Sequence, residues 1–285
     1  MLIAVPLSED KLFCFPSLVQ CLKNLLATTN AKCTVAFALN DEDEGMSEAV
    51  KGCGIPHIIV PAERPDVLTD ELWEQSAPDD VAHTFWIHHI ALARNALREY
   101  AISKNYDWMF SLDSDTVIEP NAINKLLSYN LDLASVFVRH RESAENGTPN
   151  LILLYVGRGL GSQPYTCCMF HEEFRDLPSP IFNTFPIAAA GLIHRRVFTK
   201  IHYHFGHVPL QPGEEIGDPC CSSLGRWLSE DQFFAHDAAS HGFTSVTCHK
   251  TKSIHFTDED SYPKGASNRM KEVTYDEYFA TDPRE

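Results

Sequence analysis

The pattern of apolar and polar positions divides the chain up to residue 138 into short apolar runs alternating with longer amphipathic segments. Each apolar run has the length of a buried strand and ends at Pro or at polar residues. These predicted strands cover residues 2–5, 34–39, 58–60, 108–112 and 133–138. Helices are predicted over residues 16–27 and 87–103, with a further helix opening at Pro120. Strands that alternate with helices in this way indicate a parallel sheet.

The two longer helices are predicted from apolar stripes at three- and four-residue spacing. The stripes consist of Leu18, Cys21, Leu22 and Leu25 in the first helix, and Ile90, Ala93, Leu97 and Ala101 in the second. No Gly or Pro interrupts the second helix. The acidic segment 61–86 before it is predicted to be a loop with one short helix near residues 69–75.

The pattern changes beyond about residue 140. Strands are predicted over residues 151–156 and 243–248, with a small apolar run at 187–193, a short helix from about Arg195 and a Gly/Pro-rich loop at 211–228. Ser229 and Gln232 fit a capping box, so a helix should begin there and end at Gly242. The polar residues 257–285 are expected to form a tail on the surface.

Composition narrows the class of protein. The chain has 285 residues, enough for one large α/β domain, and a net charge of −16 that disfavours nucleic acid and anionic membranes as partners. It has no apolar run long enough for a membrane span and no basic, signal-like N-terminus. Its nine cysteines include adjacent pairs at 167–168 and 220–221 but no C-x-x-C motif, which favours reduced thiols in a cytoplasmic protein.

The predicted strand 108–112 ends at Asp113, Ser114 and Asp115. In open α/β sheets, ligands bind at the carboxyl ends of the strands. Burying unpaired charge is very costly, so a divalent cation, usually with a phosphate, is the natural partner for Asp113 and Asp115, here called the acidic pair. The alternative is that these residues form a solvated loop or cap the helix that follows.

Other residues extend the motif in a fixed order. The helix before the acidic pair carries Ala93, Arg94 and Asn95; Gly191 lies in the small apolar run; Glu230 and Asp231 open a later helix; and His255 follows. This ordered set resembles the GT-A glycosyltransferases, and most closely their family-2-like inverting branch, over residues 2–256. The resemblance implies a single Rossmann-like α/β domain with a mostly parallel central sheet and a smaller antiparallel acceptor-side portion. Residues 1–138 would form the nucleotide-binding half and 139–256 the acceptor-side half.

The resemblance also implies how a donor would bind. The donor would be a nucleoside-diphosphate sugar, with a UDP-sugar expected from the frequency of UDP in the family. Asp113 and Asp115 would hold Mn²⁺ or Mg²⁺ together with His255, because oxygen ligands and one imidazole suit these ions. The nucleotide-sugar site would consist of Pro6, Asp41, Arg94, Asp113, Ser114 and Gly191, so Asp113 would also contact the donor. The sequence at 40–43, Asn-Asp-Glu-Asp, departs from the family pattern that contacts the base.

The acceptor side is implied by the same resemblance. Asp231 would be the general base that takes the proton from an acceptor hydroxyl, and Glu230 would hold that hydroxyl. Trp227 would stack on a sugar, although a core tryptophan is the equal alternative. Asp231 has an alternative too, because an acid in the first turn of a helix stabilises the helix dipole. The acceptor would be a glycan, a protein or a small molecule.

Three further interpretations compete with a glycosyltransferase. A sugar nucleotidyltransferase shares the fold and an acidic metal site, but the Gly-rich basic signature of that class is replaced here by Leu7-Ser8-Glu9-Asp10. A non-catalytic domain that binds nucleotide sugars or glycans has no need for the acidic pair, Asp231 and His255 together. A nucleic-acid acceptor is disfavoured by the net charge.

Overall fold

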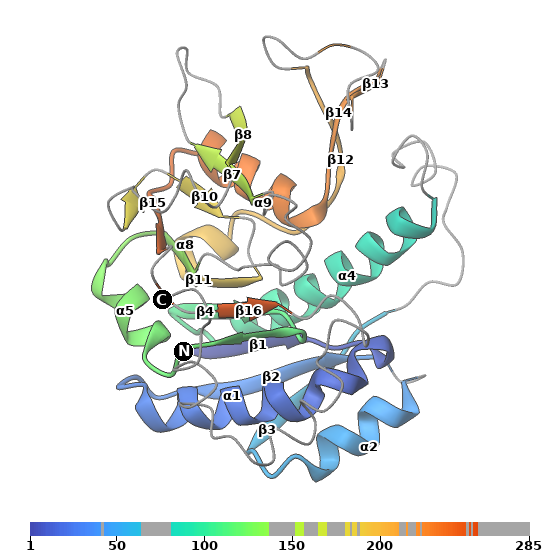
Figure 1. The fold of residues 1–285 in the computed structure, drawn as a ribbon, viewed down its shortest axis with the longest axis vertical. Coiled ribbons are helices and arrows are strands. Elements are labelled where there is room, and N and C mark those ends of the chain that lie inside the picture. The colour runs from blue at the N-terminus through green and yellow to red at the C-terminus, as the bar shows by residue number, and fades with distance from the viewer. Residues whose placement is uncertain are drawn as a thin grey trace.

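A computed structural model of the protein shows an α/β fold around a large, mostly parallel sheet (Figure 1). It describes residues 1–40, 43–63, 81–136, 152–156, 165–169, 180–182, 184–186, 189–210, 215, 221–222, 224–248, 251 and 253–255. The eight strands follow the order β3-β2-β1-β4-β11-β6-β15-β9. Strands β3, β2, β1 and β4 pair in parallel, as do β6 and β15, whereas β11 runs antiparallel to both of its neighbours. The predicted fold class is therefore confirmed.

The N-terminal part supplies the parallel strands and their helices. Its elements are β1 (Leu2–Pro6), the 3₁₀ helix η1 (Glu9–Cys14), α1 (Phe15–Thr28), β2 (Thr34–Leu39), α2 (Glu44–Gly52), β3 (His57–Pro61), α4 (Val81–Ser103), β4 (Trp108–Leu112), β5 (Thr116–Ile118), α5 (Ala122–Ser128) and β6 (Leu133–Val136). The strands predicted over residues 2–5, 34–39, 58–60 and 108–112 lie where the pattern placed them. Residues 133–136 of the fifth predicted strand form β6, and its last two residues lie outside the described ones. Helix α4 begins at Val81, before the predicted residue 87.

The C-terminal part adds strands to the main sheet and forms smaller sheets. Its elements are β7 (Ile152–Val156), β8 (Tyr165–Met169), β9 (Ile181–Phe182), β10 (Thr184–Pro186), β11 (Ala190–His194), α8 (Arg195–Phe198), β12 (Gly206–Val208), β13 (Cys221–Ser222), β14 (Gly225–Leu228), α9 (Glu230–Ser240), β15 (Ser245–Cys248) and β16 (Ser253–His255). Strands β10, β7 and β8 form one small antiparallel sheet, and β12, β14 and β13 form another. The main sheet takes strands from both predicted halves, and a boundary at residue 138 stays a prediction.

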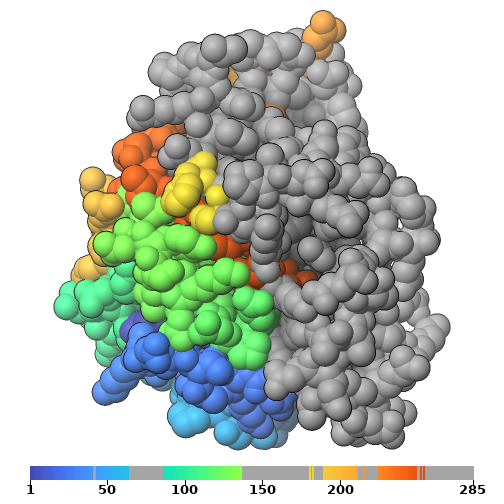
Figure 2. Space-filling view, turned by 60° about the vertical axis from the view of Figure 1, so that its left-hand side comes forward, coloured from blue at the N-terminus to red at the C-terminus, as the bar shows by residue number. Residues whose placement is uncertain are grey.

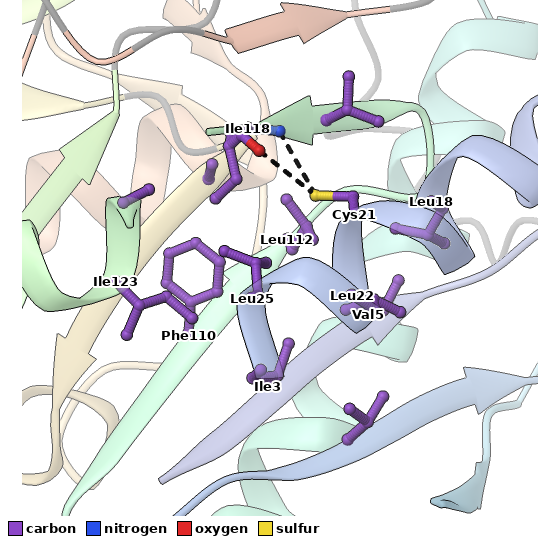
Figure 3. Close-up of a cluster of buried hydrophobic side chains, with 14 of the residues drawn as sticks. Ile3, Val5, Leu18, Cys21, Leu22, Leu25, Phe110, Leu112, Ile118 and Ile123 are labelled. Atoms are coloured by element: carbon purple, nitrogen blue, oxygen red, sulfur yellow. Dashed lines mark hydrogen bonds between the residues drawn. The ribbon is translucent and has the colours of Figure 1, made fainter. Parts of the chain in front are cut away.

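Each face of the main sheet is covered by its own hydrophobic core. On β1, Ile3 and Val5 belong to the core under α1, whereas Leu2 and Ala4 belong to the core under α4. This alternation is the expected result of side chains that point to opposite faces along a strand. Figure 3 shows the first core, in which the Cys21 thiol on α1 also lies 3.7 Å from the Ile118 carbonyl oxygen. Buried apolar side chains on both faces explain the near-continuous apolar strands of the sequence.

Helix α5 is tied to the end of α1 by one asparagine. The Asn124 amide donates to the Thr28 carbonyl oxygen at 2.8 Å, and its oxygen accepts the Asn30 N–H at 3.0 Å. Figure 2 shows the green part of the chain, which includes α5, directly above the blue N-terminal part on this face. These contacts join two helices that cover the same side of the sheet.

The buried carboxylate of Asp132, just before β6, is hydrogen-bonded to α8 and to the residue that precedes β15. Asp132 is 2% exposed, and its Oδ2 accepts both the backbone N–H and the hydroxyl of Thr244 at 2.8 Å. Its Oδ1 accepts from Arg196 on α8. Because Thr244 immediately precedes β15, Asp132 fixes the start of β6 against the start of β15.

Parts of the sequence interpretation need correction. The segment 211–228 was predicted to be a loop, but it contains β13 and β14, and Figure 1 shows β12–β14 rising away from the main sheet. Gly and Pro marked the segment as a loop, whereas β13 and β14 pair with each other as a hairpin and β14 also pairs with the earlier strand β12. The predicted helix at 69–75, the tail at 257–285 and the pairs Cys167-Cys168 and Cys220-Cys221 lie outside the residues, or the side chains, that the structure describes.

Two further findings concern the described part of the chain. Within it, Cys14, Cys21, Cys33, Cys53 and Cys248 are thiols that form no disulfide. Among its helices, none combines the length and the apolar character that crossing a membrane requires.

Candidate functional site

The acidic pair lies at the carboxyl end of β4, in the centre of the main sheet. Asp113 N–H donates to the Ala189 carbonyl oxygen at 2.8 Å, just before β11, and Thr116 N–H donates to the Asp113 carbonyl oxygen at 3.1 Å. The chain therefore makes a tight turn from β4 into β5. The side chain of Asp113 is 22% exposed and that of Asp115 is 9% exposed. The prediction that a strand carries both aspartates to the carboxyl-end edge of the sheet is confirmed.

Arg94, on α4, connects Asp113 with the start of α9. Its Nη2 donates to Asp113 Oδ1 at 2.7 Å, and its Nη1 lies 3.3 Å from Glu230 Oε1. The Arg94 and Glu230 side chains are each 4% exposed. Burial lowers the pKa of Arg94, but Asp113 and Glu230 raise it by more, so the guanidinium stays charged. One buried cation therefore joins the two acidic segments that the sequence places far apart.

Tyr203 supports Arg94 from the side. The Arg94 guanidinium carbon lies 5.5 Å from the centre of the Tyr203 ring, close enough for a cation–π contact. The ring stacks on Phe234 of α9 with 4.5 Å between centroids. Asn95 anchors the backbone of Tyr203 by donating to its carbonyl oxygen at 2.6 Å and accepting its N–H at 2.8 Å. Burial raises the pKa of Tyr203 to about 12, so its hydroxyl keeps its proton.

Glu230 and Asp231 form the first turn of α9, as predicted. The capping box is present, with the Gln232 side-chain oxygen accepting Ser229 N–H at 3.2 Å, and Gly242 ends the helix with φ +73°. Asp231 Oδ1 accepts the Ser229 hydroxyl at 2.5 Å and Gln232 N–H at 2.7 Å, which fixes the carboxylate.

Glu230 differs from Asp231 in its surroundings. It is 3% exposed, and its Oε2 has no hydrogen-bond partner among the described residues. Burial and the neighbouring Asp231 charge raise the pKa of Glu230 to about 8, against the opposing effect of Arg94. A buried carboxyl group with a raised pKa is a recurring feature of acid–base sites.

Asp115 pairs with a residue that the sequence interpretation did not include. Lys11 Nζ, on η1, lies 3.1 Å from Asp115 Oδ2. Burial lowers the pKa of Lys11, but Asp115 raises it by more, so the ammonium stays charged. The pKa of the nearby Cys14 is raised to about 12 by burial and by Asp115, which makes this thiol a poor nucleophile.

Three of the other predicted donor-site residues, Pro6, Gly191 and Ser114, lie in the described part of the chain. Pro6 is buried at the end of β1, and Gly191 is buried in β11 opposite Ser111 of β4. Ser114 is 9% exposed between the two aspartates. Asp41 lies outside the described residues.

His255 and Trp227 complete the predicted set. β16 pairs with β5 so that the backbone of His255 lies opposite Thr116, next to Asp115 in the chain, while the side chain of His255 lies outside the described ones. Trp227 is 5% exposed on β14, where it clusters with Ile87 and Phe205. This packing matches the core alternative for Trp227, and sugar stacking stays a prediction.

The acidic pair suits a hard divalent cation, because carboxylate oxygens are the ligands that Mg²⁺ and Mn²⁺ prefer. Asp115 already pairs with one cation, the Lys11 ammonium. Among the described residues, no group of three His, Cys, Asp or Glu side chains forms a complete metal site. The two aspartates therefore fit part of the predicted ligand set, with His255 as its expected third member.

No family model matches the chain, and no curated protein matches it. Several solved structures do, although weakly. CMP:2-keto-3-deoxy-manno-octonic acid synthetase complexed with CTP matches 95% of this chain and 99% of its own, at 13% identity and a TM-score of 0.47. The inositol-1-phosphate CTP transferase from T. maritima matches 95% and 94%, at 10% identity and a TM-score of 0.45. S. aureus TarS (residues 1–349) in complex with UDP-GlcNAc matches 89% and 57%, at 10% identity and a TM-score of 0.44. Likeness at this level carries no argument about function.

Sequence reasoning missed Lys11 and Tyr203. Lys11 follows Leu7-Ser8-Glu9-Asp10. Its position a few residues after the first predicted strand is the signal that could have placed it near the acidic pair. Tyr203 carries no motif, because its contacts with Arg94 and Phe234 depend on how α4 and α9 pack.

Proposed function

We propose that the protein is a metal-dependent, inverting glycosyltransferase that moves a sugar from a nucleoside-diphosphate sugar to an acceptor hydroxyl. The observation that carries the proposal is the Arg94 bridge between Asp113 and Glu230. It places the acidic pair, where a donor would bind, beside the Glu230–Asp231 turn, where an acceptor would be activated. The ordered motif set found in the sequence is consistent with this arrangement.

Donor binding in this proposal centres on Asp113 and Asp115. These carboxylates, with His255, would hold Mn²⁺ or Mg²⁺, and the ion would supply positive charge for the diphosphate leaving group. Arg94 keeps Asp113 in place through its 2.7 Å hydrogen bond. Pro6, Asp41, Ser114 and Gly191 remain the proposed contacts to the nucleotide sugar, and UDP remains the proposed nucleotide.

Acceptor activation in this proposal belongs to Asp231. Its Oδ1 is occupied by the Ser229 hydroxyl and Gln232 N–H, which orients the carboxylate towards one position. An oriented base takes a proton from the attacking hydroxyl efficiently even when it is weak, because alignment replaces the search through solvent. Glu230 and Trp227 remain the proposed acceptor contacts, and Glu230 would hold the hydroxyl with a protonated carboxyl group.

A sugar nucleotidyltransferase is the second candidate, and Lys11 is the observation that favours it. The replacement of the Gly-rich basic signature by Leu7-Ser8-Glu9-Asp10 argues against this class. The glycines are still missing, but Lys11, the next residue, brings a cation to Asp115. A fixed ammonium beside an acidic metal site would also suit a nucleoside triphosphate.

Product analysis separates the two reactions. The full-length protein is incubated with a panel of sugar nucleotides, with and without Mn²⁺, and release of nucleoside diphosphate is measured. In parallel, nucleoside triphosphates and sugar 1-phosphates are supplied, and release of pyrophosphate is measured. The proposal expects Mn²⁺-dependent nucleoside diphosphate from at least one sugar nucleotide. Pyrophosphate release alone would instead identify a nucleotidyltransferase.

A further inference from the structure

Lys11 places a fixed positive charge on the carboxylate to which the proposed function assigns the metal. The side chains of Lys11 and Asp115 are 13% and 9% exposed, and their charged atoms lie 3.1 Å apart. A weaker, more exposed partner, Asp10, lies 3.8 Å from the same ammonium with a side chain that is 57% exposed. Of these two carboxylates, Asp115 is the closer and more deeply buried partner of Lys11.

The backbone holds Lys11 in this position. Lys11 N–H donates to the Ser8 carbonyl oxygen at 3.1 Å. The Cys14 thiol contacts two carbonyl oxygens, that of Lys11 at 3.2 Å and that of Ser114 at 3.6 Å. Helix η1 is thus joined directly to the turn that carries the acidic pair, and Lys11 is part of the built site.

This arrangement has an electrostatic consequence for metal binding. A bare divalent cation at Asp115 meets the Lys11 ammonium at close range, where like charges repel strongly in a poorly hydrated setting. A diphosphate brings several negative charges that compensate both cations at once. The repulsion between the metal ion and the Lys11 ammonium is therefore relieved when the diphosphate binds together with the metal.

We propose that Lys11 makes the site at Asp115 favour a divalent cation bound together with a nucleoside diphosphate over the bare cation. The inference rests on the proposed function, because it takes Asp115 as the metal-binding carboxylate. Lys11 is released from Asp115 when the metal binds, and its ammonium then contacts the diphosphate. The affinity of each ligand then rises in the presence of the other by the same factor, as linkage requires.

The test measures bare Mn²⁺ affinity first, by electron paramagnetic resonance of free Mn²⁺ in solutions of the full-length protein. Lys11→Met removes the charge and keeps the length, so it should tighten bare Mn²⁺ binding by about tenfold or more. Lys11→Arg keeps the charge and should leave binding weak. Lys51→Met is the matched control, because Lys51 pairs with exposed Glu48 on α2 and its loss should change nothing.

The second measurement is calorimetric binding of UDP, with CDP in parallel, in excess Mn²⁺. Lys11→Met should weaken diphosphate binding by about tenfold, because one of two compensating cations is gone. Lys11→Gln repeats both measurements if Lys11→Met folds poorly by circular dichroism. The coupling between Mn²⁺ and diphosphate should shrink in either neutral variant.

Unchanged or weaker bare Mn²⁺ binding in the neutral variants overturns the inference, as does unchanged diphosphate binding. Absence of Mn²⁺ binding from wild type and variants alike overturns it too. Failure of the proposed function has a different signature. In that case no sugar nucleotide yields nucleoside diphosphate, while the bare Mn²⁺ affinities of wild type and Lys11→Met still differ.

Discussion

Arg94 and Asp113 are joined by a 2.7 Å hydrogen bond between a buried helix side chain and the carboxylate that ends the central strand. The same guanidinium lies 3.3 Å from Glu230, so its removal leaves two carboxylates without their shared cation. In the proposed enzyme, this single residue holds the donor-side and acceptor-side acids in register.

Arg94→Met should therefore lower the free energy of unfolding and abolish nucleotide binding. We expect a loss of about 3 kcal/mol, the lower end for breaking a buried ion pair, because Glu230 can take up a proton. Arg98→Met is the matched control, since Arg98 is also buried on α4 but donates to the Ile201 carbonyl oxygen at 2.6 Å. It should lose stability and keep nucleotide binding, as measured by urea denaturation and calorimetry. Equal nucleotide affinity in both variants would contradict the role of Arg94.

Asp115→Ala should abolish Mn²⁺-dependent binding of nucleoside diphosphate, because it removes a proposed metal ligand. His255→Ala should weaken that binding, since one imidazole among several ligands is lost. Asp10→Ala, which removes an exposed acid beside Lys11, should leave the binding near the wild-type value. Isothermal titration calorimetry with and without Mn²⁺ gives the comparison, and wild-type affinity in Asp115→Ala and His255→Ala would sink the metal assignment.

Asp231→Asn should keep donor affinity and lose transfer by about 10²–10⁴, the usual effect of removing a general base. Asparagine retains Oδ1, which accepts the Ser229 hydroxyl and Gln232 N–H, so the helix start should survive. If Asp231 only stabilises the helix, the variant should instead lose about 0.3–1 kcal/mol of stability and keep its turnover. Asp237→Asn, an acid on the same helix that pairs with His204, is the control that should retain turnover.

The stereochemistry of the product provides an independent check on Asp231. A base that activates the acceptor on the face opposite the leaving group inverts the anomeric configuration. Proton NMR of the anomeric centre should show this inversion, and retention of the donor's configuration would refute the mechanism.

Glu230 should make stability fall as pH rises. Burial and the Asp231 charge raise the pKa of Glu230 from 4.5 to about 8, so between these values the folded state binds more protons than the unfolded state. The folded state then loses stability with increasing pH, by up to about 1.4 kcal/mol per pH unit. Glu230→Gln should remove this slope and be relatively most stabilising near pH 8. Denaturant titrations from pH 5 to 8 would count against the assignment if both proteins showed the same slope.

Asp132→Ala should destabilise the fold without touching the proposed chemistry. The variant leaves the backbone N–H and hydroxyl of Thr244 without their acceptor, which should lower the free energy of unfolding by about 2–3 kcal/mol. Arg196→Ala is the control, because the Arg196 side chain is 59% exposed and Asp132 keeps both hydrogen bonds from Thr244 without it, so the loss of stability should be smaller. Thermal or chemical denaturation should therefore separate the two variants clearly.

The sequence by itself determined the parallel strands of the main sheet, the capped start of α9 and the position of the acidic pair at the end of β4. These features depend on local patterns: apolar runs, a capping box, and polar residues that follow a buried strand. Gly242 at the end of α9 belongs to the same group, because a left-handed residue there is a local requirement.

Only the tertiary structure decided which residues share the site. Arg94 meets both Asp113 and Glu230, and Lys11 meets Asp115, because packing around the sheet brings α4, α9 and η1 to the end of β4. The same packing turned a Gly- and Pro-rich segment into paired strands and placed Trp227 in a hydrophobic cluster. Such contacts join residues distant in the chain, and a short-range pattern of apolar and polar positions carries no information about them.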